Sequence, residues 1–157
     1  MSRIAFLTCH LTGTGHLVRT LALARTAQRL GHEVTVITGG RPLPHIDHGD
    51  LNVVQLPPVR VHRLEFTTLR EPDGTLVTDA FMAERMSRLT EALRDLKADA
   101  LVTELFPLGR RILSSEFLSA IETARLVNPQ VAVISSVRDI PEPKPKRPTQ
   151  TDRKSVC

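Results

Sequence analysis

Short apolar runs alternate along the chain with longer segments whose apolar residues recur at helical spacing. The apolar runs lie at residues 3–9, 34–38, 51–56, 99–103 and 130–136. Nearly continuous apolar strands of this kind are typical of a parallel sheet that is covered on both faces. The pattern therefore predicts five buried strands.

Amphipathic helices are predicted between these strands, over residues 16–29, 79–96 and about 113–124. The second helix has apolar residues at positions i, i+4, i+7, i+11 and i+14, which are Met82, Met86, Leu89, Leu93 and Leu96. We expect this stripe to face the core and the arginines of the helix, Arg85 among them, to lie on its surface. Strands that alternate with helices form right-handed βαβ units. The predicted fold class is therefore α/β, a doubly wound, Rossmann-like parallel sheet.

Two regions depart from this alternation. Residues 59–78 have a mixed pattern, with a turn signal at residues 72–74, and no element is predicted there. Residues 141–157 are rich in Pro and Lys and nearly free of apolar side chains, so we expect them to be disordered. The folded domain is thus predicted to span residues 1–140. The tail is either a linker to a second domain or the end of a frame-shifted or prematurely ended chain.

Composition narrows the classes of partner. The net charge is +4, but the chain has five Phe and no Trp or Tyr, so few side chains could stack on bases. A nucleic-acid partner is therefore not expected. No apolar run approaches the roughly 18 residues of a membrane-spanning helix, although peripheral contact with a membrane is compatible with the sequence. The two cysteines, Cys9 and Cys157, make a poor disulfide pair, which favours a cytoplasmic protein.

The loop at residues 10–16 is the most informative candidate site. Ligands of doubly wound sheets bind beyond the carboxyl ends of the strands, and this loop follows the first strand. Gly13, Thr14 and Gly15 would let the backbone approach a phosphate at the start of the next helix, and Arg19 could add a charge-assisted contact. The alternative is a tight turn whose glycines serve only backbone geometry.

His16 adds a candidate for proton transfer. An imidazole there could act as the general base on a hydroxyl of the acceptor, and a carboxylate on its other nitrogen would orient it. Glu104 and Asp139 follow the fourth and fifth strands and could reach the same edge of the sheet. The alternatives are that His16 bonds its own loop and that the two acids are solvated or cap helices.

Other chemistry is disfavoured. A dinucleotide fingerprint would need glycine where Val18 stands, the second strand ends without an acid for a ribose, and no P-loop is present. An NAD(P) oxidoreductase is therefore only a third choice, and no cofactor is expected. Residues 45–50 contain two His and two Asp, but their spacing matches no zinc pattern, so no metal is expected.

Several segments together resemble the opening of GT-B glycosyltransferases. These are RIAF at 3–6, GTGHLVR at 13–19, LGHEVTVITGG at 30–40, QLPPV at 55–59, ELFPLGRR at 104–111 and SVRDI at 136–140. The most similar group is the bacterial predicted glycosyltransferases related to the MurG-type, family 28 enzymes. The resemblance covers residues 3 to about 140.

The resemblance implies one half of a GT-B fold, the N-terminal domain that handles the acceptor. By the same resemblance, Gly13 and Gly15 would line the cleft, and His16 would lie near the acceptor or the donor phosphates, as a base or as a phosphate contact. The other half would bind a nucleotide-sugar donor, and the acceptor would be a sugar or a lipid-linked molecule. Donor-binding motifs are missing from these 157 residues, so we expect no transfer by this chain alone. The rival hypothesis is a non-catalytic Rossmann-like domain that binds a phosphorylated ligand or a partner protein. An exposed apolar patch around Leu105, Phe106 and Leu108 is also expected, and with it some self-association.

Overall fold

The centre of the molecule is a five-stranded, all-parallel sheet with the strand order β3-β2-β1-β6-β7. The computed structural model of the chain describes residues 1–62 and 65–137. The strands of this sheet are β1 (Arg3–Thr8), β2 (Glu33–Thr38), β3 (Asn52–Gln55), β6 (Ala100–Glu104) and β7 (Ala132–Ser136). The predicted fold class and the five predicted strands are confirmed.

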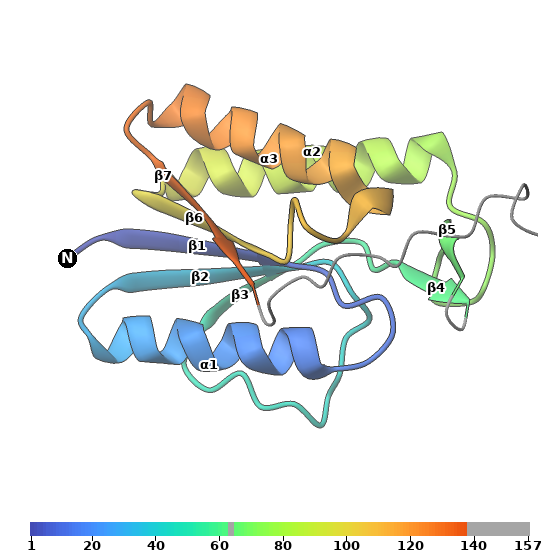
Figure 1. The fold of residues 1–157 in the computed structure, drawn as a ribbon, viewed down its shortest axis with the longest axis horizontal. Helices are drawn as coiled ribbons and strands as arrows, with labels where there is room; N and C mark the ends of the chain where they lie inside the picture. Colours follow the sequence, from blue (N-terminus) through green and yellow to red (C-terminus); the bar gives the residue numbers. More distant parts are fainter. Residues whose placement is uncertain (63–64, 138–157) are drawn as a thin grey trace, which may run out of the picture.

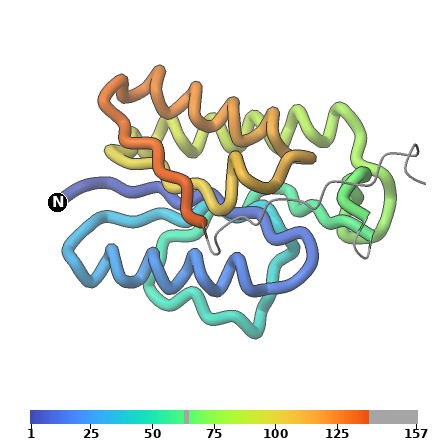
Figure 2. The backbone as a smooth tube through the Cα atoms, viewed as in Figure 1, coloured from blue at the N-terminus to red at the C-terminus, as the bar shows by residue number. Residues whose placement is uncertain are grey.

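Helices cover the two faces of the sheet unequally. On one face lies α1 (Gly15–Arg29), and on the other lie α2 (Asp79–Leu96) and α3 (Ser114–Val127), as Figures 1 and 2 show. A short 3-10 turn, η1 (Arg111–Leu113), precedes α3. The end of α1 follows the expected pattern, because Gly31 just beyond it has φ +87°, a conformation that favours glycine.

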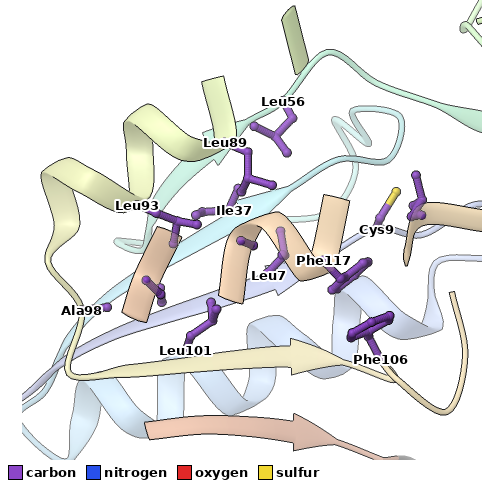
Figure 3. Packing of buried hydrophobic residues seen from close by; sticks show 14 of the residues in the cluster. Leu7, Cys9, Ile37, Leu56, Leu89, Leu93, Ala98, Leu101, Phe106 and Phe117 are labelled. Atoms are coloured by element: carbon purple, nitrogen blue, oxygen red, sulfur yellow. The ribbon is translucent and has the colours of Figure 1, made fainter. Parts of the chain in front are cut away.

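The larger part of the core lies between the sheet and the helices α2 and α3. Figure 3 shows side chains of the strands, such as Leu7 and Leu101, facing Leu89 and Leu93 of α2. Met82, Met86 and Leu96 are partly buried and pack against this cluster, which confirms the predicted apolar stripe. A second cluster under α1 contains Leu17, Leu21 and Ala24 together with residues of β1 and β2.

No element is predicted for residues 59–78, and the structure has a small hairpin there. Strands β4 (Arg60–His62) and β5 (Glu65–Arg70) pair antiparallel as a separate two-stranded sheet. The hairpin lies at the far end of the molecule from the N-terminus (Figure 1). Among the described residues of the hairpin only Val61 is buried, so its apolar pattern is too weak to predict a strand.

Two expectations about single side chains are wrong. Arg85 does not lie on the surface of α2 but is fully buried, because Glu116 of α3 pairs with it. Phe106 does not belong to an exposed patch: it is 7% exposed and stacks on Phe117, with ring centroids 4.9 Å apart. Of the expected patch, Leu108 is the clearly exposed residue, at 54%.

Candidate functional site

The strand order reverses between the neighbouring strands β1 and β6. The chain runs outward from β1 to β2 and β3 and then returns to lay β6 on the other side of β1. At such a reversal the loops after the two central strands diverge, which leaves a crevice beyond their carboxyl ends. The loops concerned are residues 9–14 after β1 and residues 105–110 after β6.

The structure brings His16 and Glu104 together at this reversal. His16 lies in the first turn of α1, and its Nδ1 is 3.1 Å from Oε1 of Glu104, the last residue of β6. The carboxylate is 2% exposed and the imidazole 25%. The distance allows Nδ1–H to donate to this carboxylate, an arrangement that leaves the lone pair of a neutral imidazole on Nε2. The ring is therefore oriented with its basic nitrogen turned away from Glu104.

Arg19 ties this pair to the edge strand β7. Its Nη2 donates to the carbonyl of Val137 at 3.0 Å and to Oγ of Ser136 at 3.5 Å. Its Nε lies 4.0 Å from Oε2 of Glu104, too far for a hydrogen bond, and neither of these buried atoms has a hydrogen-bond partner among the described residues. Oε2 thus remains a free acceptor next to a positive charge.

The loop before α1 leaves the start of this helix open. Thr14 occupies the N-cap position without a side-chain cap, and the first helical hydrogen bond runs from Val18 N to Thr14 O. The N–H groups of Gly15, His16 and Leu17 consequently have no helical partner. A Cβ added at Gly13 would meet nothing within 4 Å, and its φ is not in the left-handed region. The local fold therefore does not require glycine at position 13.

Two groups that the sequence analysis did not single out also face this edge. Arg110 has a left-handed backbone, φ 60°, and its buried Nε has no hydrogen-bond partner among the described residues. Burial lowers the pKa of Arg110, and the nearby Cys9 and Glu104 offset this only in part. His10 is 4% exposed, donates from Nε2 to the carbonyl of Arg41 at 2.9 Å, and has its pKa lowered by burial. Only the run ELFPLGRR hinted at Arg110, because one arginine in a loop carries no periodic signal.

The remaining expectations concern Asp139, the tail, a metal and a membrane span. Asp139 and the tail at 141–157 lie outside the described residues. Within residues 1–62 and 65–137, no three His, Cys, Asp or Glu side chains are grouped so as to hold a metal ion. No helix in the same ranges is long and apolar enough to cross a membrane.

Comparison with known proteins places the chain in a family. The parallel Rossmann-like sheet is a fold that this chain shares with part of a glycosyltransferase structure. The model of the glycosyl transferase 4-like domain matches residues 14–149, and the chain belongs to this family. It is thus a GT-B glycosyltransferase N-terminal domain. No curated protein sequence matches it.

Solved structures share the fold at low sequence identity. SsfS6, a glycosyltransferase from Streptomyces sp. SF2575, is 14% identical with a TM-score of 0.54; the match covers 86% of this chain and 39% of that one. The C-terminal domain of the PF1911 hydrogenase from Pyrococcus furiosus is 16% identical with a TM-score of 0.51, covering 87% and 91%. MurG from Acinetobacter baumannii is 16% identical with a TM-score of 0.48, covering 85% and 35%. The chain thus spans well under half of each glycosyltransferase.

Proposed function

We propose that this domain is the acceptor side of a glycosyltransferase and that His16 is its general base. The observation that carries the proposal is the hydrogen bond between Nδ1 of His16 and the buried carboxylate of Glu104. This bond fixes the tautomer and the direction of the ring, as a base needs. Family membership supplies the class of reaction.

The chemistry follows from that orientation. The hydroxyl oxygen of the acceptor attacks the anomeric carbon of the donor sugar, and the bond from that carbon to the nucleoside diphosphate breaks. The hydroxyl proton passes to Nε2 of His16, and Glu104 stabilises the imidazolium that forms. The negative charge that builds up on the leaving diphosphate would be met by Arg19, Arg110 and the uncapped N–H groups of α1.

Turnover is proposed to need a donor-binding domain in addition to these residues. The chain spans 39% of SsfS6, a glycosyltransferase with the same fold. On its own the chain is therefore expected to bind an acceptor but not to release nucleoside diphosphate from nucleotide sugars.

The direct test measures nucleoside diphosphate release from a panel of nucleotide sugars. The assay uses this chain joined to the donor-binding domain of a GT-B relative, beside the chain alone. We expect release only from the joined form, and we expect His16→Ala to lower its turnover about a hundredfold to ten-thousandfold. The control is His62→Ala, which changes an exposed histidine at the end of β4. Equal turnover of the two variants would refute the role of His16.

A measurement on the chain itself tests the orientation. Long-range ¹H–¹⁵N NMR spectra report which imidazole nitrogen carries the proton. We expect His16 to carry it on Nδ1 and to lose this preference in Glu104→Gln. A proton on Nε2 in the unsubstituted chain would contradict the proposed base.

A further inference from the structure

A separate cavity lies beside the first turns of α1, on the side of β2. Its volume is about 380 Å³, within the roughly 300–1,000 Å³ of small-molecule sites. It is open to solvent and is lined by Leu17 of α1, by Thr38 and Gln55 at the ends of β2 and β3, and by residues of the loop at 41–49. Neither His16 nor Glu104 lines it, so it is distinct from the polar cluster described above.

The wall of this cavity is held in place by α1. Arg25 donates from Nη2 to the carbonyl of Asp47, and Gln28 donates to the carbonyl of Asp50 at 3.4 Å. Within the loop, Ile46 N donates to Leu43 O at 2.9 Å and Gly49 N to Asp47 Oδ1 at 2.8 Å. These contacts indicate a cavity that exists before any ligand binds.

Three polar groups of the lining lack the partners that they could have. Thr38 is 2% exposed, and its Oγ1 has no hydrogen-bond partner among the described residues. The Nε2 atom of His48 is also buried and has no partner among them. Buried polar atoms are rarely left unpaired without a reason. Gln55 donates from Nε2 to the carbonyls of Thr38, Gly40 and Leu56 at 2.8–3.2 Å. Because these partners only accept, the amide cannot be flipped, and its Oε1 is left as an acceptor.

The chemistry of the lining fits a neutral, hydroxyl-rich ligand. A hydroxyl, an imidazole and an amide oxygen can each exchange hydrogen bonds with sugar hydroxyls, while Leu17, Leu43 and Ile46 offer apolar contact to ring carbons. The charges of the lining are balanced, with Arg41 against Asp47. A nucleotide fits less well, because β2 runs into Gly39 and Gly40, which offer no acid to a ribose.

We infer that this cavity binds one sugar ring of the acceptor. The assignment to an acceptor rests on the proposed function, whereas the binding of a saccharide does not. A smaller hollow of about 140 Å³ shares Arg41 and Leu43 with the cavity and reaches the loop at residues 10–12. The rest of the acceptor can therefore extend along this hollow towards the loop that precedes α1 and His16.

The test is an NMR titration of the chain with methyl glycosides of glucose, galactose and N-acetylglucosamine, beside UMP and AMP. We expect one or more glycosides to shift the amide signals of Thr38, Gln55 and the loop at 41–49, with a Kd on the order of 1 mM. No shift at these residues would overturn the inference. Shifts there caused only by the nucleotides would overturn it equally.

Matched variants decide whether the unpaired groups make the contacts. Thr38→Val removes a hydroxyl that has no partner in the structure, so the fold should tolerate it, and binding should weaken about threefold to tenfold. Thr8→Val is its control, because Thr8 is paired in register with Thr38 and has a buried, unpartnered Oγ1 but does not line the cavity. His48→Ala should weaken binding by a similar factor, whereas His45→Ala, in the same loop but outside the lining, should not.

The outcomes separate this inference from the proposed function. Saccharide binding that is weakened by Thr38→Val, together with unchanged turnover in His16→Ala, would support the sugar site and refute the role of His16 as the base. Loss of turnover in His16→Ala without any saccharide binding would do the reverse.

Discussion

Gly13 leaves space in the loop before α1, although the fold does not require glycine at this residue. A Cβ at this position meets no atom, so Gly13→Ala should change the free energy of unfolding by less than about 0.5 kcal/mol, as for surface changes elsewhere. If the loop holds an anion, the added methyl group intrudes on it and weakens binding of inorganic diphosphate. Urea unfolding and calorimetric titration measure the two effects.

The control for this change is Gly40→Ala. A Cβ there would lie 2.4 Å from both the ring and the carbonyl of His10, so that variant should be destabilised. Unchanged diphosphate binding in a stable Gly13→Ala variant would argue against the cradle.

Cys9 illustrates a buried group that resists ionisation. Burial raises the pKa of its thiol to about 11. In the unfolded chain the thiol ionises with its ordinary pKa of 9.0. Between these values the folded state binds more protons than the unfolded state, so the free energy of unfolding falls as the pH rises from about 9 to 11. Below about pH 8 the thiol makes no pH-dependent contribution.

The free energy of unfolding is expected to fall by about 3 kcal/mol at most over this pH range, because each pKa unit corresponds to about 1.36 kcal/mol. Urea unfolding of the chain and of Cys9→Ala across pH 8–11 isolates it, since the two share all other titrating groups. Parallel pH curves would contradict the prediction. Peptide mapping after thiol labelling at pH 8 should also find Cys9 unmodified until the chain is unfolded.

The sequence predicted some residue-level features of the site better than others. His16 and Glu104 could be expected on one edge because both follow central parallel strands, whose carboxyl ends share that edge. Arg110 could not, because its position depends on two left-handed residues, Leu105 and Arg110, within one loop. Arg85 could not either, because helical periodicity assigns an arginine to the surface and its partner lies 31 residues further along.

Among the elements, α2 and α3 are connected by the ion pair between Arg85 and Glu116, which also contacts the segments after β2 and β3. Both side chains are fully buried, with Nη2 of Arg85 2.9 Å and Nε 2.5 Å from the carboxylate. Nη1 also donates to the carbonyls of Gly39 and Pro57, beyond β2 and β3. Burial alone would lower the pKa of Arg85, but its contacts with Glu116 outweigh this and raise it. The pair therefore fixes the strand ends that surround the candidate sites.

Breaking this pair should be costly. Arg85→Met leaves a buried, unpaired carboxylate and should lower the free energy of unfolding by about 3–5 kcal/mol, whereas Arg85→Met with Glu116→Leu should recover much of the loss. The control is Arg88→Ala, which removes the exposed pair with Glu84 and should cost less than about 1 kcal/mol. Urea unfolding measures all three. A loss below 1 kcal/mol in Arg85→Met would show that the pair does not hold the layers together.

The strands of the parallel sheet were easier to predict than the hairpin because more of their residues are buried. Strands such as β2 are buried over nearly their whole length and carry a strong apolar signal. In β5 three of six residues are exposed, and β4 has only three residues. A pairing of that kind depends on backbone hydrogen bonds between segments, which an apolar pattern does not record.

At the scale of the whole molecule, β7 is the feature that bears on association with other copies. Within the described residues it is an edge strand, so one side of its backbone is open to pairing. Its Ile134 is 48% exposed and lies in register with the buried Val102 of β6. Exposed backbone beside an apolar side chain promotes edge-to-edge pairing of chains. The site of association is thus expected at β7 rather than at Phe106, which is buried.

Ile134→Lys should therefore reduce self-association with little loss of stability. A charged side chain on an edge strand opposes pairing between copies, and a residue that is already half exposed gives up little burial when it is replaced. Light scattering over a concentration series should show a higher mean mass for the unsubstituted chain than for the variant. Leu126→Lys is the control, because Leu126 is 83% exposed and belongs to α3 rather than to the edge strand. If both substitutions lower the mean mass equally, general surface charge rather than β7 governs association; if the unsubstituted chain stays monomeric throughout, β7 is not an adhesive edge.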